Sequence, residues 1–300
     1  MWDNLQILGT APVFNIQLVL NGLSVGAVFA LAAYGLALVW GVTSVKNLAQ
    51  GDFVMMGGYV GYEFSRHGIH PILAIVPTAV VMFAYGWVIY KLIIRRVIQL
   101  DLFTSLLATF GLAITMQQVL NLVFGPDVRT LRSGFGRFEM FGGMVDITQI
   151  RVIAFGLCSV LAVVMVLFLR NSRMGQAIRA TAQDPRAARV LGVDTDLVYA
   201  LTFSINSAIC GVAGVIIAMI WVIQPFYGIA YSVRAFVIVT AAGLGNFPAV
   251  ILTALGLGVI EQYGGFVLGA QFQQATVVSL LLIILIWRQM LLRRHRLALQ

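Results

Sequence analysis

The chain has 300 residues, of which 60% are hydrophobic and only 10% are charged, and its mean hydropathy is +0.96. Soluble domains carry about 25% charged residues, so this composition excludes a soluble protein and predicts an all-α integral membrane protein with one transmembrane domain, residues 1–300. The net charge of +8 does not indicate nucleic acid binding, because the arginines cluster beside apolar spans, as topology signals do.

Six apolar runs are long enough to cross a bilayer: 15–42, 72–94, 103–124, 148–170, 197–222 and 274–290. Two further regions, 51–64 and 233–262, are shorter and rich in glycine, and the sequence GLGNFP at 243–248 divides the second. Lysine and arginine gather in cytoplasmic loops. The basic clusters at 91–96, 170–189 and 288–296 therefore mark the cytoplasmic side.

Counting crossings between these clusters gives a topology. Residues 233–262 have to begin and end outside, which two short crossings satisfy, as does a re-entrant loop. The same count puts the N-terminus outside and the C-terminus in the cytoplasm. The sequence therefore predicts about nine crossings, within a range of about eight to ten.

The order of the spans repeats. A long span, a short glycine-rich segment and two further spans occupy residues 15–124, and the same order recurs in the opposite direction at 197–290. Inverted repeats with broken helices are typical of transporters, whose path lies between the halves. Channels carry such repeats too, so the pattern favours transport without naming the mechanism.

The sequence contains no signature of an enzyme. It has no G-x-x-x-x-G-K-[ST] loop, and neither of its two lysines, Lys46 and Lys91, follows a glycine loop. There is no H-E-x-x-H, no Cys/His cluster and no G-x-S-x-G, so we expect no catalytic residue, metal or cofactor. The acidic candidates Asp52 and Glu261 lie at the ends of segments, which disfavours an ion-coupled carrier. If the protein pumps, the energy arrives from another chain.

The cytoplasmic loop 171–196 is predicted to contain a short helix of about seven residues. Asp184 suits the N-cap, Pro185 the first helical position and Gly192 the position after the helix. Asp196 can cap the next span. So short a helix is unstable alone and has to pack on its own bundle or on a partner. The alternative is a solvated loop whose arginines obey the positive-inside rule.

Three stretches resemble the membrane permease of the branched-chain amino acid ABC importers. They are NGLSVGAVFALAAYGLALVWGVTSVKNLAQGDFVMMGGYVGY at 21–62, GQAIRATAQDPRAARVLGVD at 175–194 and VRAFVIVTAAGLGNFPAVILTALGLGVIE at 233–261. The resemblance implies a coupling helix that docks in a groove of the ATPase subunit and maps here onto Asp184, Pro185, Arg186, Ala187, Ala188, Arg189, Leu191 and Gly192. It also implies a bacterial inner-membrane location and three partners: ABC ATPase subunits, a second homologous permease and an extracytoplasmic solute-binding protein.

The solute stays open at this point. The chain has Gln50 and Asp52 where the family typically has His and Glu, and the same family includes permeases for urea, short amides and aromatic acids. Branched-chain or other amino acids are the leading expectation. A facilitative channel or a secondary carrier is the alternative from another class.

Two glycine breaks are the candidates for the translocation path, and we expect them to face each other. Their residues are Gln50, Gly51 and Asp52 at the first and Gly243, Gly245 and Asn246 at the second. Exposed backbone amides at such breaks suit a carboxylate. The alternatives are that Asp52 caps the helix 53–62 and that the second break is a plain turn. The outer loop 125–150 carries Arg129, Arg132 and Arg137 and is the candidate surface for the solute-binding protein; the alternative is a structured hairpin lid.

Overall fold

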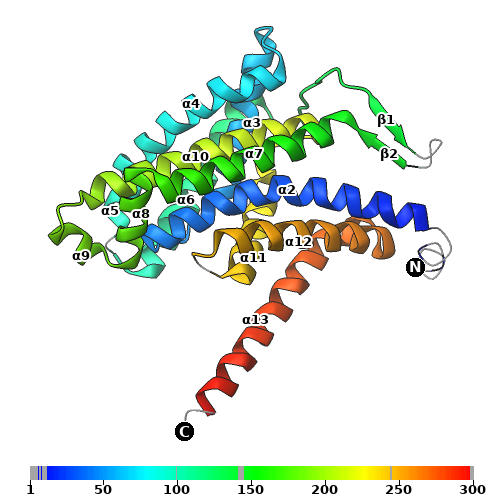
Figure 1. Cartoon of the computed structure of the whole chain (residues 1–300). Helices are drawn as coiled ribbons and strands as arrows, with labels where there is room; N and C mark the ends of the chain where they lie inside the picture. The colour runs from blue at the N-terminus through cyan, green and yellow to red at the C-terminus, as the bar shows by residue number, and fades with distance from the viewer. Residues whose placement is uncertain are drawn as a thin grey trace.

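The computed structural model describes residues 6, 8, 12–98, 100–140, 145–243 and 245–297. Almost all of this part is helical (Figure 1). The helices are α2 (Pro12–Thr43), α3 (Gln50–Arg66), α4 (Pro71–Ile89), α5 (Arg95–Val97), α6 (Leu102–Phe124), α7 (Gln149–Asn171), α8 (Arg173–Gln183), α9 (Pro185–Val190), α10 (Thr195–Ile220), α11 (Gly228–Ala242), α12 (Phe247–Leu268) and α13 (Gln273–Leu297). A π-helical turn, Tyr90–Ile94, joins α4 to α5.

A small antiparallel hairpin interrupts the helices in the outer loop. It pairs β1 (Arg137–Met140) with β2 (Val145–Thr148), so that Arg137 lies opposite Thr148. Just before it, the backbone of Arg129 exchanges hydrogen bonds of 2.9 and 2.8 Å with Ile223. The predicted outer loop is therefore a structured hairpin tied to the segment that follows α10, while its role as a lid or as the surface for the solute-binding protein stays a prediction.

Seven helices are long and apolar enough to cross a membrane, among the residues described. Five of them, α2, α4, α6, α7 and α10, coincide with predicted spans, and α11 and α12 divide the glycine-rich region 233–262 as expected. The shorter α3 has 17 residues, and an apolar helix covers Ala270–Ile286. These helices confirm a multi-pass, all-α membrane protein. The number of crossings stays a prediction.

The bundle is built around α2 and α10. In their apolar windows 89% and 78% of the residues are buried, against 17% in α7. A helix that is apolar all round belongs inside a bundle, and here small residues permit close packing. A Cβ on Gly22 of α2 would overlap the backbone of Val259 in α12, and one on Gly57 of α3 would overlap Gly211 in α10.

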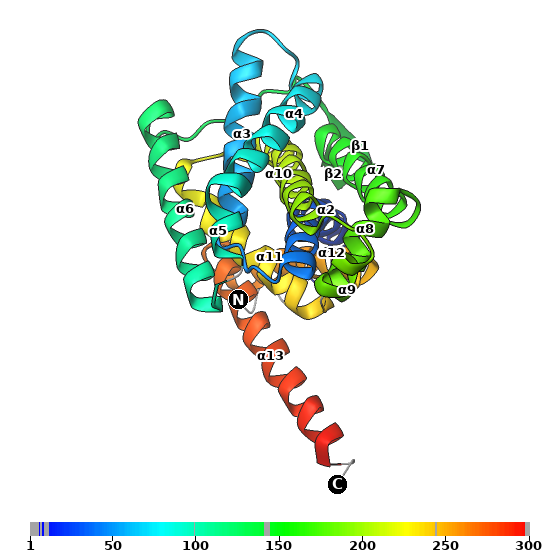
Figure 2. The same ribbon diagram turned by 90° about the vertical axis from the view of Figure 1, so that its left-hand side faces the viewer.

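The two ends of the bundle carry different connections. The end of α5 and the α8–α9 loop lie at one end, and the β1–β2 hairpin lies at the other (Figure 1). Figure 2 views the molecule from the end that carries α8 and α9. In both views α13 leaves the bundle and projects away from it. Several of its apolar side chains are exposed, including Leu282, Ile283 and Ile286.

Candidate functional site

The start of α3 lies against the start of α11. The amide of Gly51 donates a hydrogen bond of 2.8 Å to the hydroxyl of Ser232, which itself donates one of 2.8 Å to the carbonyl of Leu48. A Cβ on Gly51 would overlap the carbonyl oxygen of Gly228. Two short helices thus meet at their first turns, and glycine is required because the two backbones touch there.

Gln50 links three helices through a buried pair of amides. Its Nε2 donates to the carbonyl of Ala32 at 2.8 Å and to Oδ1 of Asn206 at 2.9 Å, and Asn206 Nδ2 donates back to Gln50 Oε1 at 3.2 Å. Both side chains are fully buried. Buried polar groups stabilise a fold when they are paired, so in this conformation Gln50 fastens α3 to α2 and α10.

Asp52 sits in the first turn of α3, where a negative charge suits the helix dipole. The residue at the N-cap position is Ala49, so the expectation that Asp52 caps helix 53–62 is wrong. The carboxylate is 1% exposed and accepts a hydrogen bond of 2.9 Å from Nε2 of Gln117 in α6. It also lies against Gly228, whose added Cβ would overlap it. Asp52 therefore belongs to the contact between α3, α6 and α11.

The second glycine break lies elsewhere, and the expectation that the two breaks face each other is wrong. Gly243 ends α11 with φ +85°, and the side-chain oxygen of Asn246 caps α12 by accepting from the amide of Ala249 at 3.3 Å. Gly51 contacts the opposite end of α11. The break that lies against α3 is the segment between α10 and α11, residues 221–227, which ends in a 3-10 turn, Pro225–Tyr227.

Gly245 lines a cavity of about 480 Å³ close to the cytoplasmic loop. The end of α2 supplies one wall, and α8 supplies another through Ile178, Arg179, Ala182 and Gln183. The backbone of Gly245 has φ +82°, which favours glycine. The second break therefore sits beside the element that precedes α9, and not beside the α3–α11 contact.

The predicted cytoplasmic helix is present as α9. Asp184 Oδ1 accepts hydrogen bonds of 2.8 and 3.1 Å from the amides of Arg186 and Ala187, and Gly192 follows with φ +85°. The amides of Ala187 and Arg186 hold the pKa of the Asp184 carboxyl below its usual value. The alternative of an unstructured loop is therefore wrong, because both caps operate in register.

One of the residues predicted to contact the ATPase does not lie on the exposed face of α9. Ala188 is 2% exposed and packs inward, whereas Val190 and Leu191 are 87% and 82% exposed. Large apolar side chains that are exposed on a loop outside the membrane spans indicate an interaction surface. The apolar contact area therefore comes from Val190 and Leu191, together with the exposed Ala187.

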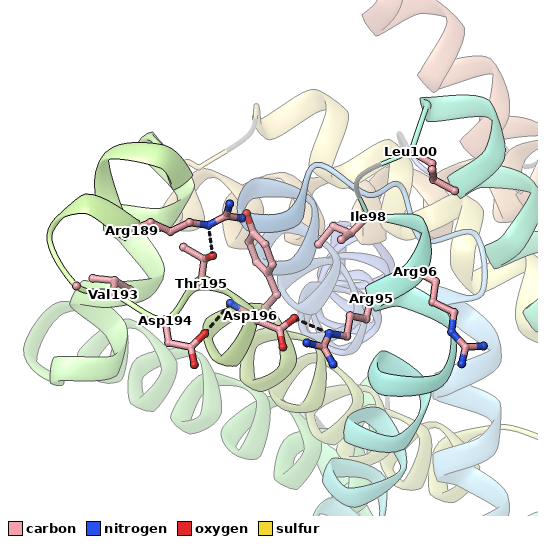
Figure 3. A pocket seen from close by; sticks show the side chains of 11 residues that line it. Arg95, Arg96, Ile98, Leu100, Arg189, Val193, Asp194, Thr195 and Asp196 are labelled. Carbon is pink, nitrogen blue, oxygen red and sulfur yellow. Dashed lines mark hydrogen bonds and ion pairs between the residues drawn. The ribbon is translucent and has the colours of Figure 1, made fainter.

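A polar pocket of about 630 Å³ lies beside α9, between the start of α10 and the end of α5 (Figure 3). Arg95 pairs with Asp196 at 3.2 Å, and Asp196 also accepts a hydrogen bond of 2.8 Å from the hydroxyl of Tyr90. Arg189 donates to Thr195 at 2.7 Å. These contacts tie α9 and the start of α10 to the end of α4 and α5.

The cap of α10 is Asp194 and not Asp196. Asp194 Oδ1 accepts hydrogen bonds from the amides of Asp196 and Leu197 at 3.0 and 3.1 Å. Asp196 is in the first helical turn, where it is free to point toward Arg95. The expectation that Asp196 caps this span is therefore wrong, because Asp194, two residues earlier, accepts the capping hydrogen bonds.

Sequence reasoning missed an ion pair inside the bundle. Arg234 of α11 donates through Nε and Nη2 to both oxygens of Glu261 in α12, at distances from 2.5 to 3.2 Å. The side chains are 14% and 6% exposed. Glu261 is thus buried within α12 and does not lie at the end of a segment as expected. The signal available in the sequence was Arg234 itself, because it is a basic residue outside the three predicted cytoplasmic clusters.

Comparisons with known proteins agree with these features. A family model described as branched-chain amino acid transport system / permease component matches residues 18–287. The high-affinity branched-chain amino acid transport system permease protein LivH of Escherichia coli K12 is 30% identical over 290 residues, which cover 91% of this chain and 94% of LivH.

Two further relatives carry similar names. The permease protein BraD of Pseudomonas aeruginosa PAO1 is 29% identical over 289 residues, which cover 91% of this chain and 94% of BraD. The permease protein LivM of Escherichia coli K12 is 30% identical over 177 residues, which cover 55% of this chain and 40% of LivM. The family match along most of the chain and the similarity to LivH show that this protein belongs to the permease components of branched-chain amino acid transport systems, and it is therefore a membrane transport subunit and not an enzyme.

Proposed function

We propose that this permease forms one half of the membrane channel of an ATP-driven importer for branched-chain amino acids. Its partners are two ABC ATPase subunits, a second homologous permease and an extracytoplasmic solute-binding protein. The similarity of one chain to both LivH and LivM supports a pair of related permeases. The capped helix α9 is the observation that carries the proposal, because it offers a rigid contact to a partner on the side of the basic loops.

The ATPase binds α9 and the residues around it. Asp184, Pro185 and Gly192 fix the two ends of the helix. Val190 and Leu191 fill a groove of the ATPase, and burying such side chains supplies most of the binding free energy. The arginines 186 and 189 steer an acidic partner toward the loop. Movement of the ATPase reaches the bundle through Arg189–Thr195 and Arg95–Asp196.

The chain crosses the membrane about nine times, with the N-terminus outside and the C-terminus in the cytoplasm. The two halves form an inverted repeat. Support comes from the order of elements: α2 and α10 are long, a linker without α-helix follows each, and α3 and α11 have 17 and 15 residues. α2 packs on α12 as α10 packs on α4, and α3 and α11 meet at their starts.

The translocation path passes the contact between α3 and α11, because transporters place their sites where broken helices meet. Gln50, Gly51 and Asp52 hold this contact from the side of α3. Gly243, Gly245 and Asn246 lie at the cytoplasmic mouth, where the cavity beside α8 opens. The hairpin β1–β2 and the loop that carries Arg129 and Arg132 receive the solute-binding protein.

Reconstitution tests the proposal. The chain, its sister permease and the ATPase subunits are placed in vesicles with the solute-binding protein, and uptake of labelled leucine, urea, short amides and benzoate is measured with and without ATP. We expect leucine uptake that requires ATP and every subunit. Flux through this chain alone would instead indicate a facilitative channel or secondary carrier, and ATP-dependent uptake of urea or benzoate in place of leucine would reassign the solute.

A further inference from the structure

A third cavity, of about 250 Å³, lies between the middle of α2 and the segment where the chain re-enters the bundle after α10. We call it the aromatic cavity. Three of its walls are the rings of Phe29, Trp221 and Tyr231, and the rest of its lining is Val25, Tyr227, Arg234, Glu261, Gln262 and Gln273. Its volume lies just under the roughly 300–1,000 Å³ of drug-sized ligand sites, as suits a solute of about ten non-hydrogen atoms.

Two opposite charges face this cavity from adjacent helices. Glu261 is buried and Arg234 is largely so, and the guanidinium also lies over the rings of Phe29 at 5.1 Å and Tyr231 at 5.8 Å. Ionisable residues inside membrane spans are costly, face the bundle interior or a water-filled cavity, and mark solute pathways. A pair kept only to fasten two helices is a weak explanation, because apolar residues of similar size stabilise a fold equally well.

The guanidinium keeps capacity for a ligand. Arginine has five N–H donors. Among the residues that the structure describes, Arg234 Nε and Nη2 donate to Glu261, and Nη1 donates to the carbonyl of Ala230 at 3.1 Å. One N–H on each terminal nitrogen therefore remains for a carboxylate, in the fork geometry that carboxylates match. Glu261 Oε2 receives one of the three hydrogen bonds of the pair and retains acceptor capacity for an ammonium.

We propose that the aromatic cavity binds the zwitterionic head of an amino acid on its way through the permease, with the α-carboxylate on Arg234 and the α-ammonium on Glu261. The site carries no net charge but separates its two charges, which is the complement of a zwitterion. The proposal rests on the function proposed above and names a solute site within it.

The rings give the aliphatic side chain its place. Phe29 and Trp221 are stacked with centroids 6.5 Å apart and an angle of 18°, and Tyr231 meets Phe29 edge-on at 6.1 Å. Apolar walls with a few convergent polar groups are typical of small-molecule sites. Ring faces also attract an ammonium group. Leucine, isoleucine and valine share one head group and differ only in the part that meets these rings, so one site serves all three.

The position of the cavity fits a transport site. Val25 and Phe29 lie near the middle of α2, and Tyr227 directly precedes Gly228, which contacts Asp52 at the start of α3. The aromatic cavity is therefore adjacent to the junction of the two short helices. Binding near the midplane at discontinuous helices is the arrangement expected of transporters with inverted repeats.

The first test removes both charges at once. Arg234→Met combined with Glu261→Leu leaves no unpaired buried charge, so we expect the variant to assemble with its ATPase. Its leucine uptake in the reconstituted importer should fall about tenfold or more, because the charge-assisted contacts to the head group are lost. Uptake equal to the unmodified importer would overturn the proposal and leave the pair a structural fastening. The unmodified importer must transport in the same assay, and its failure to do so would count against the proposed function instead.

The second test reads binding directly and does not need the double variant. Tyr227 is 42% exposed and lines the cavity, while the native Cys158 and Cys210 are buried. In Tyr227→Cys permease, saturating leucine should slow reaction with a thiol reagent severalfold. 3-Methylbutylamine, which lacks the carboxylate, and 4-methylpentanoate, which lacks the ammonium, should not. Equal protection by all three, or by none, would overturn the proposal even if the double variant failed to assemble.

Discussion

The amide of Gly51 donates a hydrogen bond to the hydroxyl of Ser232 across 181 residues of sequence, at the place where the start of α3 meets the start of α11. The hydroxyl in turn donates a hydrogen bond to the carbonyl oxygen of Leu48, near the end of the linker before α3. One serine therefore fixes both the entry of the chain into α3 and its distance from α11. A membrane interior tolerates such non-helical backbone only where protein or water satisfies it.

Alanine at position 51 should separate these helices. The added Cβ would overlap Gly228 and lie 2.6 Å from the amide of Ser232, and overpacking of this kind costs about 1–3 kcal/mol. Gly41→Ala in α2 is the matched control, since nothing lies within 4 Å of its Cβ. The thermal unfolding midpoints of the two purified variants measure the difference. Equal midpoints would show that the α3–α11 contact is loose enough to accept a methyl group.

The exposed end of α9 should determine ATPase binding. Val190→Asp with Leu191→Asp should weaken co-purification of the ATPase about tenfold or more and abolish ATP-dependent uptake, because apolar anchors dominate interfaces. Val128→Asp is the control, since Val128 is 55% exposed on the outer loop. Normal ATPase binding by the double variant would exclude α9 as the docking element.

A substitution at Ala188 should act on the fold of the loop and not on the interface with the ATPase. Because it is 2% exposed, Ala188→Asp buries an unpaired charge and should disrupt the α8–α9 loop itself. Loss of ATPase binding in that variant would not identify a contact residue. Comparison with the Val190 and Leu191 substitutions separates damage to the loop from damage to the interface, and limited proteolysis between α8 and α10 reports it.

The cap of α9 should depend on pH. The pKa of Asp184 is lowered in the folded loop by the amides of Ala187 and Arg186. The carboxylate therefore stabilises α9 fully above its pKa in the unfolded chain, and this stabilisation is lost as the pH falls through the folded value. Asp184→Asn caps without titrating. Protection of the Arg186 and Ala187 amides from hydrogen exchange should fall in acid for the native chain and stay constant for the Asn variant.

The features that local sequence determines were predictable. Length and apolarity place the spans that became α2, α4, α6, α7 and α10, because a helix that crosses a bilayer needs about 20 apolar residues. The order Asp184, Pro185 and Gly192 places α9 because caps act within one turn. Neither inference required knowledge of what packs against what.

The features that depend on register between helices were not predictable. The pair Arg234–Glu261 joins residues of α11 and α12 whose facing sides depend on the turn at 243–246. The break before α11 was missed because the predicted span ended at Val222 and the next segment began at Val233, so that residues 223–232 stood only as a connection between them. Gly243 and Gly245 instead indicated a break at the other end of α11, where Gly243 ends the helix.

Cysteine labelling from each side of the membrane should decide the topology. Val190→Cys, on α9, should react with an impermeant thiol reagent only from the cytoplasmic side, and Ala270→Cys, in the exposed turn between α12 and α13, only from outside. The native cysteines 158 and 210 are buried, so they contribute little background. Opposite labelling requires an odd number of crossings between Val190 and Ala270, and the proposed arrangement has three, formed by α10, α11 and α12.

These two positions do not distinguish three crossings from one. If α11 and α12 together formed one re-entrant loop that returned to the outside, α10 would be the only crossing and the two labels would still fall on opposite sides. Asn246, which is exposed between α11 and α12, therefore provides the deciding position. Asn246→Cys should react from the cytoplasm in the nine-crossing arrangement and be reached only from outside if the segment turns back within the membrane.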